Sequence, residues 1–220
     1  GKVAFTGGVN LADEYANEIT RFGHWKDTAI MLKGDAVQSF TMLFLEMWAV
    51  NQMEPADCQN YLTPKHVVPD PPHGYVIPYG DHPYDNENVG EEVYFHILNH
   101  SKKYVHIMTP YLILDSEMIT TLTRAAKSGI EVIIIMPHIP DKWYAFVLAH
   151  TYYKELIQAG VSIYEYTPGF VHAKVFVSDD DTATVGTINL DYRSLYLHFE
   201  CGAYIYDHPV VADIEQDFQE

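Results

Sequence analysis

The stretch of residues 170–200 constrains the fold more than any other part of the chain. It reads FVHAKVFVSDDDTATVGTINLDYRSLYLHFE, with single polar residues set among short apolar, β-branched runs. Residues 171–178 alternate with a period of two, which predicts a β-strand. On such a strand His172 and Lys174 share one face.

The residues that follow predict a hairpin. Three consecutive aspartates at 179–181 favour a turn, and residues 182–185 form a second β-rich run that ends at Gly186. Because the second strand returns along the first, we expect Asn189 to come back toward His172.

An imidazole, an ammonium group and an amide on one spot suit a tetrahedral anion. Histidine exchanges protons near neutral pH because its unperturbed pKa is about 6.5. Lysine and asparagine would stabilise oxygen charge that develops in a transition state. A lone histidine on a strand is usually structural, so the linked spacing of His172, Lys174 and Asn189 is what favours phosphoryl chemistry.

This spacing resembles the signature of the phospholipase D superfamily, with a threonine where serine is commoner. Here the signature reads His172-x-Lys174-x4-Asp179-x6-Gly186-Thr187-x-Asn189. Four shorter words are similar, more narrowly, to bacterial cardiolipin synthases: GHWKD at 23–27, TPY at 109–111, YEY at 164–166 and NLDYRS at 189–194.

The resemblance implies an α/β phospholipase D fold, with a mixed, largely parallel sheet flanked by helices and two pseudo-repeated halves, the first incomplete. It implies phosphatidyl transfer between two phosphatidylglycerol molecules, giving cardiolipin and glycerol through a phosphohistidine intermediate. By analogy His172 would be the acid/base, and Lys174 and Asn189 would bind phosphoryl oxygens. No cofactor or metal is implied. The partners implied are phosphatidylglycerol or related anionic phospholipids, and the intact protein would place a soluble catalytic domain at the cell membrane.

Two carboxylates in this region have different expected roles. Glu200 begins the strand after the motif, and the family resemblance implies that it binds the second imidazole nitrogen of His172, fixing its tautomer. Asp179 belongs to the catalytic signature, but its expected role is structural, holding the turn and pairing with a nearby donor.

The chain contains an internal repeat. A strand at 2–6 leads through two glycines to Asn10, as the strand at 182–185 leads to Asn189, and a carboxylate follows each asparagine, Asp27 in the first copy. We therefore expect Asn10 and Asp27 to support the first half of the site, with Asp27 serving a histidine that would precede Gly1.

The repeat divides the chain into three parts. Residues 1–54 are expected to be the remainder of the first repeat, 55–74 a linker, and 75–220 the second repeat. A mechanism with two histidines needs both copies, so we expect this chain not to catalyse transfer by itself. Its opening, GKVAFTGG, has no secretory pattern and is expected to lie inside a domain.

From residue 75 onward, strands alternate with helices, which predicts helices on both faces of a largely parallel sheet. Strands are expected at 75–78, 104–108, 131–136 and 161–166, and helices at 89–100, 116–128 and 142–158. The apolar run at 130–136 predicts a central strand buried on both faces. Ser116 is the expected N-cap, and Gly129 and Gly160 the expected helix stops.

The charge of the chain excludes some partners. A net charge of −17, from 13 basic and 30 acidic residues, argues against a nucleic-acid partner. It also argues against a basic patch that adheres to anionic lipid. Cys58 and Cys201 lack metal-ligand or disulfide-framework spacing, and the longest apolar run, at 42–50, is too short to span a bilayer.

Other interpretations stay open. His96 and His100 are four apart on an expected helix, but a structural role is favoured over a metal because no third ligand is evident. An aromatic stretch at 143–153 fits either core packing or lipid contact. A hydrolytic phospholipase or phosphodiesterase would share every catalytic residue, a nuclease is disfavoured by charge, and a non-catalytic lipid-binding module is the alternative from another class.

Overall fold

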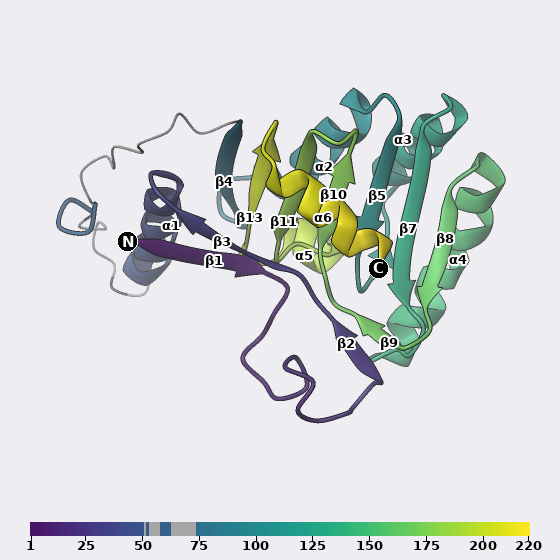
Figure 1. Ribbon diagram of the computed structural model, residues 1–220, viewed down its shortest axis with the longest axis horizontal. Helices are drawn as coiled ribbons and strands as arrows, with labels where there is room; N and C mark the ends of the chain where they lie inside the picture. The colour runs from purple at the N-terminus through teal and green to yellow at the C-terminus, as the bar shows by residue number, and fades with distance from the viewer. Residues whose placement is uncertain (51, 53–57, 63–73) are drawn as a thin grey trace.

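The computed structural model describes residues 1–50, 52, 58–62 and 74–220 (Figure 1). The expected linker at 55–74 lies largely outside the described residues. No helix in the described part of the chain combines the length and hydropathy that crossing a bilayer requires.

A seven-stranded sheet in the order β4-β13-β11-β10-β5-β7-β8 forms the main layer (Figure 1). In chain order its strands are β4 (Tyr75–Asp81), β5 (Tyr104–Met108), β7 (Glu131–Pro137), β8 (Ser162–Tyr166), β10 (Val175–Ser178), β11 (Thr182–Gly186) and β13 (Glu200–Tyr206). The pairs β5-β7 and β7-β8 are parallel, and every other neighbouring pair in this sheet is antiparallel. The sheet is mixed as expected, but the expectation that it is largely parallel is wrong, because the β10–β11 hairpin and the return of β13 place antiparallel neighbours side by side.

Helices cover both faces of this sheet, as the alternating pattern predicted. One face carries α2 (Val89–His100), α3 (Ser116–Lys127) and α4 (Trp143–Ala159), and the other carries α6 (Val210–Gln219) (Figure 1). The period of two in β10 sorts its side chains between them. Phe176 stacks on Tyr94 of α2 with ring centroids 4.1 Å apart, whereas Val175 and Val177 join the cluster around Val211 of α6.

Some local expectations need correction. Asp115, not Ser116, caps α3, because its carboxylate accepts the Met118 amide at 2.7 Å. Gly129 and Gly160 follow their helices in the left-handed conformation, as predicted. Strand β7 lies inside the sheet, but only one of its faces is fully buried; Ile133 and Ile135 on the other face are half-buried.

The first fifty residues form a small unit that packs against this sheet. Its elements are β1 (Val3–Gly7), β2 (His24–Lys26), β3 (Ala29–Lys33) and α1 (Ala36–Val50). Strands β1 and β3 pair antiparallel, as β11 and β13 do in the main sheet. Strand β2 pairs parallel with β9 (Gly169–Val171), which leads directly to His172. This crossing connects the N-terminal segment with the second half of the chain.

Candidate active site

His172 lies in an irregular segment between β9 and β10, not within one continuous strand as the alternation predicted. The interruption has a visible cause. The His172 amide donates to the Lys26 carbonyl at 2.7 Å, which extends the pairing of β9 with β2 and draws the chain away from the main sheet. The expected meeting of His172 with Lys174 is nevertheless found.

Asp27 is the carboxylate that binds His172. Its Oδ2 lies 3.0 Å from His172 Nδ1, and the Asp27 side chain is only 4% exposed. The expectation that Glu200 fills this role is wrong, and so is the assignment of Asp27 to another histidine. The reason is the β2–β9 pairing, which places the residue after β2 beside the residue after β9.

Lys174 is the second group at Nδ1. The lysine Nζ lies 2.9 Å from His172 Nδ1 and also bonds the His172 carbonyl oxygen. Nδ1 has either a hydrogen or a lone pair, so it cannot serve both neighbours. The Asp27 carboxylate only accepts hydrogen bonds and favours the tautomer with hydrogen on Nδ1, which leaves the lone pair of Nε2 available for chemistry.

Burial controls the protonation of both groups. It lowers the pKa of Lys174 to about 7, against the opposing charges of Asp27, Glu200, Asp191 and Asp141. Burial also lowers the pKa of His172, helped by the charge of Lys174 and opposed by the hydrogen bond to Asp27. The Lys174 side chain can therefore change protonation state near neutral pH.

Aromatic rings enclose the His172 imidazole. The ring of Tyr15 meets it edge-on at 5.1 Å, and the Trp25 and Phe170 ring centroids each lie 5.9 Å away. Asn10 donates to the Tyr15 hydroxyl at 2.8 Å, so this expected support residue reaches the site through Tyr15. Our sequence reasoning missed Tyr15, although the aromatic content of the loop between Asn10 and Asp27 was a signal for it.

Asn189 and Glu200 belong to a neighbouring polar chain. Asn189 Nδ2 donates to Ser194 Oγ at 2.9 Å, and this hydroxyl donates to Glu200 Oε1 at 2.9 Å. Thr187 Oγ1 donates to the other Glu200 oxygen. Burial raises the pKa of Glu200, against these two hydrogen bonds and the charges of His198 and Lys174. Asn189 thus contacts Ser194, and its convergence with His172 on a phosphoryl group stays a prediction.

Asp179 lies at the opposite end of β10 from His172. Its carboxylate accepts the backbone amides of Lys102, Lys103 and Tyr104 at 2.6, 2.8 and 3.0 Å. Burial raises the pKa of Asp179, but the three amide donors outweigh it and hold the pKa below its usual value. This geometry fits the structural role expected for Asp179, anchoring the turn to the start of β5, and gives no support to a catalytic one.

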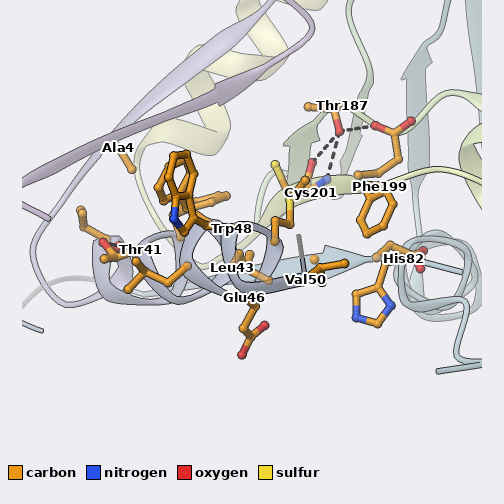
Figure 2. A pocket seen from close by; sticks show the side chains of 18 of the residues that line it. Ala4, Thr41, Leu43, Glu46, Trp48, Val50, His82, Thr187, Phe199 and Cys201 are labelled. Carbon is orange, nitrogen blue, oxygen red and sulfur yellow. Dashed lines mark hydrogen bonds between the residues drawn. The ribbon is translucent and has the colours of Figure 1, made fainter. Parts of the chain in front are cut away.

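An open groove of about 1050 Å³ lies between α1 and the ends of β4 and β13. Figure 2 shows Trp48 of α1 at this groove, together with Thr187 and its hydrogen bonds. Glu200 and Thr187 line the groove, whereas His172 and Lys174 are not among its lining residues.

Two further expectations concern residues away from the site. Within the described ranges no three His, Cys, Asp or Glu side chains converge as a metal-binding group. His96 and His100 pack ring against ring, with centroids 4.1 Å apart. Along the aromatic stretch Trp143 and Tyr144 are exposed, whereas Tyr153 is half-buried.

Comparisons with known proteins found a matching family model and related sequences. The family model described as "Cardiolipin synthase, PLD-like domain" matches residues 94–220. All 220 residues align at 59% identity with 47% of an uncharacterized protein of Streptococcus mutans, and at 38% with 43% of cardiolipin synthase 2 of Bacillus cereus. The chain therefore spans less than half the length of these curated relatives.

Solved structures share the fold at low identity. The phosphatidylserine synthase of Haemophilus influenzae matches 98% of this chain over 59% of its own length, with a TM-score of 0.71 and 17% identity. The phospholipase D family member Nuc of Salmonella typhimurium matches 64% of this chain over 92% of its own, with a TM-score of 0.51 and 18% identity. These matches establish the fold alone.

Proposed function

Because this chain belongs to the cardiolipin synthase family of phospholipase D-like domains, we propose that it supplies one half of a phosphatidyltransferase site. The whole protein would join two phosphatidylglycerol molecules into cardiolipin and release glycerol. The observation that carries this proposal is the buried contact of His172 with Asp27 and Lys174, which places a carboxylate and a lysine amine next to the imidazole ring.

The chemistry needs two imidazoles. One Nε2 attacks phosphorus and the bond to the glycerol oxygen breaks, while the second imidazole, as imidazolium, gives that oxygen its proton. The second imidazole then takes a proton from the hydroxyl of another phosphatidylglycerol, and this oxygen displaces the first histidine from phosphorus. We assign His172 to the acid/base role by family analogy. The pattern His-x-Lys-x4-Asp occurs once in these 220 residues.

Lys174 and Asn189 would hold the charge on the phosphoryl oxygens. The ammonium form of Lys174 supplies a positive charge in a buried setting, where it interacts with an oxyanion more strongly than in water. The amide nitrogen of Asn189 carries two hydrogens, and its bond to Ser194 uses one. The second would serve a phosphoryl oxygen.

We assign Glu200 to the other histidine. Asp27 and Glu200 occupy equivalent places in the internal repeat, and Asp27 binds the histidine of the second copy. A site with two similar halves would then pair Glu200 with the histidine of the first copy. The matching antiparallel pairs β1-β3 and β11-β13 support the division into a first repeat at 1–54 and a second at 75–220.

The substrate class follows from the proposed reaction. Phosphatidylglycerol or a related anionic phospholipid lies in a bilayer, so the site would work at a membrane surface. The negative charge of this chain, −17, means that attraction to the phosphate must come from groups at the site, such as Lys174, and not from the general surface.

The test uses this chain and a form extended at its N-terminus to include a second His-x-Lys set, both incubated with phosphatidylglycerol vesicles. Mass spectrometry should detect cardiolipin from the extended form, and His172→Asn should remove it. Phosphatidic acid as the main product would replace the proposal with a hydrolase. Vesicle binding with no turnover would replace it with a lipid-binding module, and cardiolipin from the short chain would show that one set suffices.

A further inference from the structure

The last turn of α6 holds the segment that carries Asp27. Asp217 Oδ1 accepts a hydrogen bond from Lys26 Nζ, and Asp217 Oδ2 accepts one from Thr28 Oγ1 at 2.7 Å. These two donors flank Asp27 in the chain. We propose that Asp217 is a positioning residue, which keeps the Asp27 carboxylate on His172 by binding the residue on either side of it.

The backbone of the same segment is fixed from the other side. The Lys26 carbonyl accepts the His172 amide at 2.7 Å, and the Thr28 carbonyl accepts the Gly8 amide at 3.1 Å. Asp217 adds the side-chain contacts to these backbone bonds. Lys26 and Thr28 are thus each held by a backbone hydrogen bond and a side-chain hydrogen bond. Asp27, which lies between them, has little freedom to rotate away from the imidazole.

Both oxygens of the Asp27 carboxylate are bonded, and the space around the carboxylate is filled. Oδ2 meets His172, and Oδ1 accepts the amide of Thr28 at 2.9 Å. A β-carbon added at Gly8 would lie 2.2 Å from Oδ1, so the glycine packs directly against the carboxylate. A shift of residues 26–28 would therefore change the Asp27–His172 distance instead of being absorbed locally.

Helix α6 is packed firmly enough to hold Asp217 in place against Lys26 and Thr28. Val211, Ile214 and Phe218 are buried in the core, and Phe218 stacks on the His106 ring at 4.6 Å. A partly exposed ion pair usually contributes little to stability, and the Lys26 and Asp217 side chains are 18% and 34% exposed. The specific feature is that both carboxylate oxygens of Asp217 accept hydrogen bonds, one from the residue before Asp27 and one from the residue after it.

The test measures the pKa of His172 by NMR titration of the 220-residue chain, with the His172 signal identified by its loss in His172→Asn. The charged groups that contact this ring are Asp27 and Lys174, and the Tyr15 ring meets it edge-on. The hydrogen bond to Asp27 raises the pKa of His172, so a loosened Asp27 should lower it. We expect Asp217→Asn to lower it by about 0.5 unit.

Two further variants separate positioning from charge. Thr28→Val removes one of the two hydrogen bonds to Asp217 without changing any charge. We expect it to lower the His172 pKa by less than Asp217→Asn does. Asp213→Asn makes the same substitution at an exposed position in the first turn of α6 and should leave the His172 pKa unchanged. In an Asp27→Asn background, Asp217→Asn should have no further effect, because a direct charge effect would persist there whereas positioning would not.

The inference fails if folded Asp217→Asn and Thr28→Val both keep the wild-type His172 pKa, or if the decrease persists without Asp27. If Asp217→Asn does not fold, Thr28→Val decides alone. The effect on turnover rests on the proposed function: in the extended form we expect about a tenfold loss of transfer for Asp217→Asn, with recovery in Asp217→Glu. Absent turnover in the wild type would refute the proposed function and leave the NMR result standing.

Discussion

Asp27 and Glu200 occupy equivalent places in the proposed internal repeat and have different surroundings. Asp27 binds the His172 imidazole at 3.0 Å, whereas Glu200 accepts the hydroxyls of Thr187 and Ser194. The difference arises because β2 pairs with β9, so the acid of the first unit crosses to the histidine of the second. A repeat predicts equivalent positions, but the packing between its copies decides which groups meet.

The helices that close the two units differ in the same way. Helix α6 buries Val211, Ile214 and Phe218 against the main sheet, whereas Asp213 is exposed on its outer side. Helix α1 is apolar on nearly every side, yet it buries only Val37 and leaves Phe44 and Trp48 about 60% and 58% exposed. A helix that is apolar all round is typical of a position with neighbours on several faces.

Loss of the Asp27 carboxylate should have the largest effect on activity. Asp27→Asn keeps the shape but allows the wrong imidazole tautomer, so phosphatidyl transfer by the extended form should fall about ten-thousandfold. Product formation from phosphatidylglycerol measures it. Asp35→Asn, a change of the same kind outside the site, is the control. An equal loss of transfer in that variant would show that the effect is not specific to Asp27.

The two helices should differ in their contributions to stability. Phe218→Ala removes a buried ring that stacks on His106 and should lower the free energy of unfolding by about 3 kcal/mol. Trp48→Ala on α1 should change it by less than about 0.5 kcal/mol, because the ring is exposed. Urea unfolding of both variants gives the values, and equal losses would show that α1 packs as tightly as α6.

The second unit should bind an oxyanion in a pH-dependent way through Lys174. Its pKa of about 7 means that the ammonium form is lost as the pH rises above that value. Sulfate affinity, measured by calorimetry, should therefore fall about tenfold for each pH unit above about 7. Lys174→Met should bind weakly at every pH. A flat profile in the wild type would place the anion elsewhere.

A change at Glu200 should have only a small effect on His172. Because Glu200 binds Thr187 and Ser194 and not His172, Glu200→Gln should shift the His172 pKa by less than about 0.2 unit. Asp27→Asn, measured by the same NMR titration, should lower it clearly. A large shift in Glu200→Gln would restore the pairing that the sequence alone led us to expect.

Local chemistry made most of the second unit predictable. The strands and helices after residue 75 follow from apolar periodicity, and the turn at Asp179 follows from residues that tolerate positive φ. The meeting of His172 with Lys174 was expected from their spacing, although the segment that carries them is irregular and not a strand. The relative direction of neighbouring strands was harder to predict. Strands separated by helices indicate parallel pairing, but the β10–β11 hairpin and the pairing of β13 with β11 are antiparallel.

The partners of the site residues depended on contacts that no local pattern contains. Asp27 and His172 are 145 residues apart, and their pairing depends on β2 joining β9. Tyr15 reaches His172 for the same reason. A family resemblance can assign an acid to a catalytic set, but the residue it serves is fixed by how the two units dock.

The β2–β9 pairing also limits how one half of the chain could be exchanged for its counterpart in a related protein. A unit exchanged for its counterpart in a relative would bring its own carboxylate to a foreign histidine, so the segment at 24–28 and the segment at 169–172 must match across the exchange. The two halves of the pattern are repeats in form, but the pairing of β2 with β9 makes them one interlocked part.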